Sequence, residues 1–208
     1  MTCFPGSDPI LDCAAAAAFE QSYFDGDEAR EWDAMQRAGT AVADALLRDL
    51  QMAGVPLSEP GRVLLLVGKG HNGGDAILAV ARLSARTSWT VEVGFVFGQN
   101  RLRPLAVAAW RKLQHQGGAG RVKAVRSSAV EGQRYLAVLD GVFGFQFRSP
   151  LPDVAKHWFG ASQGATTRFR GSVDLPSGLD EDGAFVADAT YAPGSRKAPL
   201  LSCSGAVR

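Results

Sequence analysis

The sequence predicts an α/β domain, a three-layer αβα sandwich in which helices cover both faces of a doubly wound, mostly parallel sheet. Two observations support this prediction. Short, uniformly apolar segments that suit buried strands alternate along the chain with longer segments of helical periodicity. A glycine-rich turn also follows the first of these strands directly and opens a helix, as in a βαβ unit.

The elements follow one another along the whole chain. Residues 11–21 and 28–50 suit helices, and the turn signal Asp25-Gly26-Asp27 separates them. Apolar residues recur in the second segment at helical spacing and are expected in the core: Trp32, Met35, Ala38, Val42 and Leu46. Strands are expected at residues 62–67, 91–97, 122–125, 135–140 and 169–174, and helices at 77–86, 104–116 and 151–162. Residues 185–191 could form one more edge strand, and residues 195–208 give no clear element.

Composition bounds the size and the partners of this domain. With 208 residues, 46% of them hydrophobic, the chain can bury one sizeable core, so we expect residues 1–208 to form a single domain. Lysine and arginine number 22 against 21 acidic residues, which leaves no overall positive field for nucleic acid or an anionic membrane. Any anion site must therefore be local.

Cysteine use and the N-terminal sequence point to the cytoplasm. Cys3, Cys13 and Cys203 form no CxxC pair or Cys/His cluster, which argues against a zinc site and a disulfide framework. The first basic residue is Arg30, so the start of the chain lacks the charge pattern of a signal peptide. No apolar stretch approaches the roughly 20 residues that span a bilayer. We therefore expect reduced thiols and no membrane partner.

The segment after the first strand, residues 68–75, reads GKGHNGGD. Its glycines satisfy GxGxxG, which lets the backbone approach a phosphate at a helix N-terminus. Alone this match is weak, and an NAD-dependent oxidoreductase should also carry an acidic residue after its second strand, where this chain reads FGQN. Asp75 would favour the helix dipole but compete with a phosphate, and it could be only a helix-start residue. Asn72 could likewise be only a turn or cap residue.

Two later strands end in carboxylates. Asp140 closes one strand in the sequence LDGVFG, and Asp174 closes the next in VDLPSGLD, where a proline-fixed turn displays Ser177. The carboxyl ends of parallel strands meet at one edge of a sheet, so these groups are expected near the glycine loop. Partial burial there would raise the pKa of Asp140 towards a range useful for proton transfer. Alternatively, Asp140 could only cap a turn, and Pro-Ser-Gly could be an ordinary turn.

The three motifs GKGHNGGDA, DGVFG and DLPSG resemble the GxGNNGGDG, DAxFG and DxPSG motifs of the YjeF N-terminal domain family, the NAD(P)HX epimerases. The resemblance covers about residues 11–200, including a segment WDAMQRAG at 32–39 that is similar to the family's MExAG segment. It implies a Rossmann-like fold and an isomerase of metabolite repair. The reaction interconverts the R and S forms of NADH or NADPH hydrated at C6.

The resemblance also implies a site. Oxygen atoms of Asn72, Asp140 and Ser177 would bind a potassium ion, as suits a hard cation. Asp140 would be the catalytic residue, helping the C6 hydroxyl leave and guiding water back, although potassium ligation would lower its pKa. The dinucleotide substrate would contact two segments and one strand end: His71, Asn72, Gly73, Gly74, Asp75, Gly144, Phe145, Gln146, Phe147, Arg148, Ser149, Pro150 and Asp174.

The sequence departs from the family pattern at two positions of the glycine loop. His71 stands where asparagine is usual, and it could donate a hydrogen bond or simply pack. Ala76 replaces a glycine, and its methyl group would interfere if the ligand needed a close backbone approach. Lys69 could favour a phosphate or be solvated.

Partners follow from the resemblance as well. A homodimer is expected, with the helical face of residues 32–46 as its candidate surface. The family continues beyond the segment that ends here at Arg208, so the chain could be the truncated N-terminal part of a bifunctional protein with a C-terminal dehydratase domain.

The alternative hypothesis for the function is a non-catalytic binding or dimerisation module, similar to domains of mRNA-decapping scaffolds. Its nucleic-acid contact would need a basic face, for which the candidates are Arg101, Arg103 and Arg111 near Trp110. The chain retains the site residues of the family, which favours the enzyme over this module and predicts no nucleic-acid partner.

Overall fold

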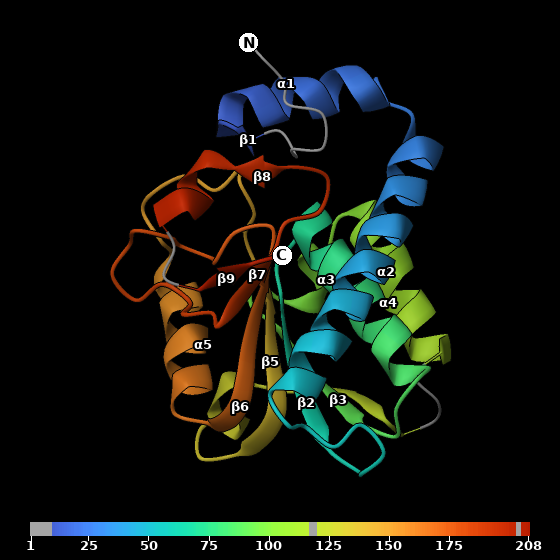
Figure 1. The fold of residues 1–208 in the computed structure, drawn as a ribbon, viewed down its shortest axis with the longest axis vertical. Helices are drawn as coiled ribbons and strands as arrows, with labels where there is room; N and C mark the ends of the chain where they lie inside the picture. The colour runs from blue at the N-terminus through green and yellow to red at the C-terminus, as the bar shows by residue number, and fades with distance from the viewer. Residues whose placement is uncertain (1–9, 117–119, 203–204) are drawn as a thin grey trace.

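The computed structural model describes residues 10–116, 120–202 and 205–208, and these residues form a seven-stranded sheet (Figure 1). The strand order is β4-β3-β2-β5-β6-β7-β9, and every neighbouring pair is parallel. The strands are β2 (Arg62–Val67), β3 (Thr90–Phe95), β4 (Val122–Ala124), β5 (Arg134–Gly141), β6 (Thr166–Val173), β7 (Ala189–Tyr191) and β9 (Ala206–Val207).

Helices cover both faces of this sheet, as the sequence predicts. One face carries α2 (Glu28–Met52), α3 (His71–Ser84) and α4 (Pro104–Gln116), and the other carries α5 (Asp153–Gln163) (Figure 1). Side chains of a strand alternate between the two faces, so Leu65 packs with the three-helix side and Leu64 with the α5 side. The doubly wound fold is therefore confirmed.

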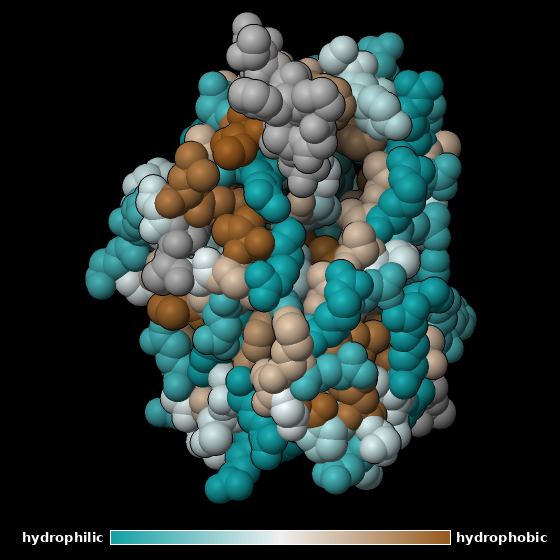
Figure 2. Space-filling view, in the orientation of Figure 1, coloured by the Kyte–Doolittle hydropathy of each residue, from teal (hydrophilic) through white to brown (hydrophobic). Residues whose placement is uncertain are grey.

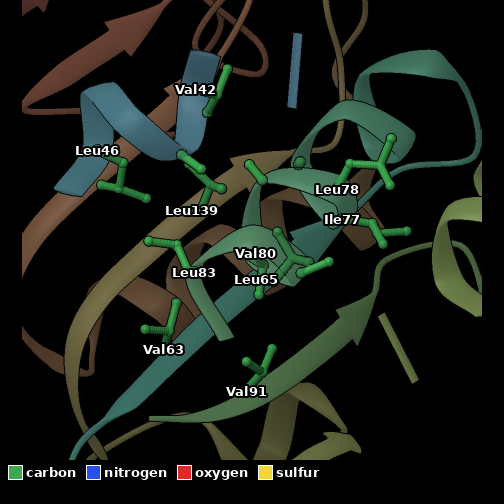
Figure 3. Close-up of a cluster of buried hydrophobic side chains, with 14 of the residues drawn as sticks. Val42, Leu46, Val63, Leu65, Ile77, Leu78, Val80, Leu83, Val91 and Leu139 are labelled. Atoms are coloured by element: carbon green, nitrogen blue, oxygen red, sulfur yellow. The ribbon is translucent and has the colours of Figure 1, made fainter. Parts of the chain in front are cut away.

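The larger hydrophobic core lies beneath α2 and α3. Figure 3 shows Val42 and Leu46 of α2 and Ile77 of α3 among the strand side chains that they cover. Met35 is buried as expected, but Trp32 and Ala38 are only partly buried. The closest approach of this part of α2 to α3 is at Gly39, where a Cβ would meet the side chain of Leu78 at 2.6 Å. Along all the described residues, no helix has the length and apolar character needed to cross a membrane.

The prediction for the start of α3 is wrong by six residues. The helix begins at His71 rather than at residue 77, and both glycines of the NGG sequence lie inside its first turn. Their missing side chains make room for neighbours: a Cβ on Gly73 would meet the carbonyl oxygen of Gly68 at 2.6 Å, and one on Gly74 would meet Met35 Sδ at 2.6 Å. Close contact with neighbouring elements overrides the weak helix propensity of glycine here.

The C-terminal prediction is also corrected. The strand expected at 185–191 is only β7, and it is no sheet edge because β9 pairs with it. Residues 195–208 do contribute elements, since β8 (Arg196–Lys197) pairs with β1 (Ile10–Leu11) in a small second sheet. Near this second sheet, α1 (Cys13–Phe24) crosses one end of the molecule (Figure 1).

The chain reverses its direction across the sheet between β2 and β5. It runs from β2 outwards through β3 to β4, and then returns to the other side of β2 as β5. A ligand crevice is expected at such a switch point, beyond the carboxyl ends of the strands. Gly68 N donates a hydrogen bond to Gly141 O at 3.1 Å just there. The predicted motifs thus start from two adjacent strand ends.

Close contact between α3 and β5 explains how the chain accommodates Ala76. This residue is fully buried, and its methyl group lies so close to Gly141 that a Cβ on Gly141 would collide with it. We expect Gly141→Ala to lower the free energy of unfolding by about 1–3 kcal/mol, because the two methyl groups collide. Urea unfolding of a double-mutant cycle with Ala76→Gly measures this, and the double variant should lose less stability than the sum of the single ones. Strict additivity would contradict the contact.

Candidate active site

A cavity of about 350 Å³ lies beyond the carboxyl ends of β2, β5 and β6. Most residues predicted to bind a substrate line it: His71, Asn72, Asp75, Gly144, Phe145, Gln146, Phe147, Arg148 and Asp174. Other predicted residues are not among the lining residues: Gly73, Gly74, Asp140, Ser149, Pro150 and Ser177. The methyl group of Ala76 does not line the cavity either, so it does not obstruct a ligand there.

Asp140 lies in a fully buried polar cluster. Its Oδ1 accepts hydrogen bonds from Val142 N at 3.0 Å and Ser177 Oγ at 2.8 Å, and its Oδ2 accepts one from Ser177 N at 2.9 Å. Burial raises the pKa of Asp140 to about 6, although these hydrogen bonds oppose the rise. Phe143 connects this cluster to the glycine loop, since its N–H donates to Ser177 Oγ and its carbonyl accepts from Asn72 Nδ2, both at 2.8 Å.

One oxygen atom of this region has no partner. Asn72 Oδ1 is buried and, among the described residues, accepts no hydrogen bond. A buried oxygen of this kind is costly unless something binds it. With the oxygens of Asp140 and Ser177, it makes a donor set that suits a hard cation. No group of three or more His, Cys, Asp and Glu side chains in the described residues could hold a softer metal.

Asp174 is the carboxylate that the structure fixes most firmly at the cavity wall. Its backbone lies in the left-handed region, with φ of 68°, and only 7% of the residue is exposed. Phe145 N donates to Oδ2 at 2.6 Å, and Lys197 Nζ lies 2.7 Å from Oδ1. A strained backbone that holds a buried ion pair is a common property of functional sites. Lys197 is not predictable from the sequence, because residues 195–208 show no clear pattern of an element.

Two more carboxyl groups line the cavity. Asp75 comes from the second turn of α3 and Glu20 from α1. Burial raises the pKa of Asp75 well above its usual range, and the charges of Asp174 and Glu20 add to this rise while Lys197 opposes it. Burial also raises the pKa of Glu20. Nothing in the sequence pointed to Glu20, which lies outside all of the motifs.

The raised pKa of Asp75 predicts a pH-dependent stability. A carboxyl with a higher pKa in the folded state makes the free energy of unfolding fall as pH rises from its ordinary pKa, about 4, through the raised value. Asp75→Asn removes this loss, so its Tm should exceed that of the wild type at about pH 8 and approach it at about pH 4. Thermal unfolding followed by circular dichroism tests this, with the exposed Asp182→Asn as the control. A difference in Tm that does not change with pH would contradict the assignment.

An aromatic wall forms another part of the cavity. The rings of Phe97 and Phe147 flank that of Phe143, with centroids 5.6 and 4.9 Å from it. Lys69 Nζ lies 4.7 Å from the Phe97 ring centroid, so its charge is held at this wall. Such a wall can pack against a flat ring. Phe97 and Phe143 were not predicted as site residues, although Phe143 lies within DGVFG, because single aromatic residues among apolar neighbours are typical of a core.

The structure also shows where His71 and the predicted basic face lie. His71 is exposed, and its Nε2 lies 3.5 Å from Glu31 Oε2 at the cavity margin. The expected aromatic partner of the basic face is in the core, since Trp110 is 6% exposed and packs edge-on against Phe95. Of the three arginines of that face, Arg103 lines the cavity.

Comparisons with known proteins agree with the motifs. The family model described as YjeF-related protein N-terminus matches residues 32–194. "NAD(P)H-hydrate epimerase" of Rhodobacter capsulatus is 30% identical over 83% of this chain and 78% of its own length. The protein of the same name from Bordetella pertussis is 32% identical over 70% of this chain and 57% of its own.

Two further relatives define the domain context and the fold. "Bifunctional NAD(P)H-hydrate repair enzyme Nnr" of Gloeobacter violaceus is 35% identical over 71% of this chain, which spans only 27% of that protein's length. The crystal structure of yeast ynu0 (YNL200c) superposes with a TM-score of 0.73 at 18% identity, covering 94% of this chain and 84% of the yeast chain. At that identity the likeness concerns the fold alone. The match of the family model to residues 32–194 and the Rhodobacter relative together show that the chain belongs to the YjeF-related protein N-terminus family.

Proposed function

We propose that this protein interconverts the R and S epimers of NADH or NADPH hydrated at C6, as an isomerase of metabolite repair. One observation carries the proposal: three strand-end motifs meet at a single cavity, where Asp174 is held at the wall and Asp140 is buried outside the lining in hydrogen-bond contact with Ser177. The names of the relatives support the same reaction.

The chemistry of the site suits this reaction. Expulsion of the C6 hydroxyl by the ring nitrogen leaves an iminium cation, and water then adds to either face of the ring. Negative charge beside the ring stabilises that cation, and the carboxylate of Asp174 is placed at the cavity wall to supply it. The rings of Phe97, Phe143 and Phe147 offer a surface for the flat part of the substrate.

The sequence predicts Asp140 as the catalytic residue. Its pKa of about 6 suits proton transfer near neutral pH. Its carboxylate, however, is fully buried, accepts three hydrogen bonds from the protein and is not part of the cavity lining. We therefore propose that Asp140 serves as a cation ligand and as the scaffold of Ser177, while Asp174 acts on the substrate.

Potassium is the cation that we propose for the oxygen set of Asn72, Asp140 and Ser177. When bound, it would supply positive charge that compensates the buried carboxylate. Potassium chloride is then expected to raise the Tm relative to N-methylglucamine chloride at equal ionic strength, because a ligand of the folded state stabilises it. Asn72→Ala should abolish this difference. Asn100→Ala, at the chain's other asparagine and exposed, should keep it. Equal stabilisation by both salts would contradict the site.

Further partners are part of the same proposal. The chain spans little more than a quarter of the bifunctional Gloeobacter protein, so a C-terminal dehydratase domain could accompany it in the whole protein.

A homodimer through residues 32–46 and a cytoplasmic location stay predictions. Figure 2 shows mainly hydrophilic residues over the outer side of α2, with hydrophobic surface near the β1–β8 end, where Ile10 and Leu201 are exposed, and a second hydrophobic area in the lower right part of the view. An α2 interface would therefore be polar.

Interconversion of the two hydrate epimers tests the function directly. Purified protein is mixed with one epimer in potassium buffer, and the approach to equilibrium is followed by chiral-phase chromatography against a protein-free control. We expect clear acceleration. A folded protein that gives none would refute the epimerase and leave the binding or dimerisation module.

A further inference from the structure

We propose that Lys197 donates the proton to the C6 oxygen as it leaves the substrate, an inference that rests on the proposed epimerase function. The relevant observation is a buried ammonium group at the wall of the cavity. It belongs to none of the three motifs and lies nineteen residues beyond the end of DLPSG.

The position of the ammonium leaves it free to act on a ligand. Only 3% of Lys197 is exposed, and it lines the cavity with its Nζ 5.3 Å from the Phe145 ring centroid. Among the described residues, Nζ contacts two oxygens, Asp174 Oδ1 at 2.7 Å and Pro193 O at 3.3 Å. An ammonium has three N–H donors, so the described part of the chain leaves one for a ligand in the cavity.

The fold holds this lysine in place from the far end of the chain. Lys197 is the second residue of β8, and its register partner in β1 is Leu11. Directly after β1, Asp12 caps α1 by accepting a hydrogen bond from Ala15 N at 2.7 Å, and α1 then brings Glu20 to the same cavity. A lysine is rarely so buried unless it is paired, and an apolar side chain could fill the position at less desolvation cost. The burial of Lys197 therefore indicates that its side chain has a function in the cavity.

The charges around Lys197 balance the proposed step. Its ammonium lies among carboxyl groups from three elements, Asp174 after β6, Asp75 on α3 and Glu20 on α1, with the thiol of Cys13 also near it. Arg148 lines the same cavity. When the proton leaves, Asp174 keeps its hydrogen bond from Phe145 N and its charge lies beside the cavity. The cationic ring that forms then takes over the role of counter-ion.

The step conserves atoms and electrons. The C6–O bond breaks with its electron pair on oxygen, and the lone pair of the ring nitrogen forms the new C=N bond. Lys197 gives its proton to that oxygen, which departs as water. The Lys197 side chain is then a neutral amine. In the return step, water forms the C–O bond on the opposite face and loses a proton to the solvent, and the neutral Lys197 amine takes up a proton from the solvent. Nothing is oxidised or reduced.

Substitution of Lys197 tests the assignment. We expect Lys197→Met and Lys197→Arg each to lower kcat for epimerisation by at least about 100-fold, the effect of losing a general acid. Arginine keeps the positive charge beside Asp174 but does not give up its proton, so Lys197→Arg should show little change in KM. Lys123→Met, at an exposed lysine on β4 far from the cavity, should keep the kcat of the wild type.

The outcomes separate this inference from the function on which it rests. A wild type that does not accelerate epimerisation refutes the function, and with it the role of Lys197. An active wild type with an equally active Lys197→Arg overturns the role of Lys197 alone, because charge without an exchangeable proton then suffices. If Lys197→Met fails to fold, the folded Lys197→Arg variant still decides between these results.

Discussion

Asp174→Asn should lower the rate of epimerisation by at least about 100-fold while leaving the protein folded, because a fixed charge beside a developing cation contributes on this scale. Asparagine is the matched replacement, since it tolerates the left-handed backbone that Asp174 adopts at φ 68°. Its amide oxygen can still accept the hydrogen bond from Phe145 N. The substitution then removes charge rather than shape, and with the charge it removes the ionic partner of Lys197.

The control for this substitution is another aspartate with the same backbone conformation. Asp180 has φ of 69°, is exposed and does not line the cavity, so Asp180→Asn should keep the full rate. Initial rates with each epimer, measured beside thermal unfolding of all three proteins, provide the comparison. An Asp174→Asn variant with the rate of the wild type would show that this carboxylate does not stabilise the cation.

Asp140→Ala should have the largest effect on stability. It leaves two buried donors, Val142 N and Ser177 N, without an acceptor, and it leaves Ser177 Oγ only the longer hydrogen bond to Phe143 O at 3.3 Å. Each unpaired buried donor costs about 1–3 kcal/mol, so we expect the free energy of unfolding to fall by about 3 kcal/mol or more. Asp140→Asn keeps one acceptor oxygen and should lose less. Urea unfolding at neutral pH measures both.

The same pair of variants decides what Asp140 does in the reaction. If Asp140→Asn folds and keeps a measurable rate, the carboxylate does not transfer the proton, as we propose. If it folds, binds potassium and has no activity, the proton transfer predicted from the sequence is restored. A matching Ser177→Ala variant, which removes one donor to Asp140 but no carboxylate, separates damage to the cluster from loss of the acid.

Local sequence patterns were sufficient to predict most strands of the sheet. The uniformly apolar run of β2 could hardly form anything but a buried strand, and alternation with helical segments implies parallel neighbours. The helical start at His71 was not predictable in this way. Glycines in sequence signal a turn, and only their contacts with Met35 and Gly68 show why a helix tolerates them.

The sequence alone determined the fold class, the family and the approximate position of the site, because short motifs at strand ends depend on local backbone geometry and on the common direction of parallel strands. The tertiary structure decided which of these residues face the cavity. It buried Asp140 out of the cavity wall and left Asp174 in it. It also brought in Glu20 and Lys197 through the pairing of β1 with β8. That pairing joins segments about 185 residues apart, and a contact between such distant segments leaves no periodic signal in the sequence, since it depends on how the whole chain packs.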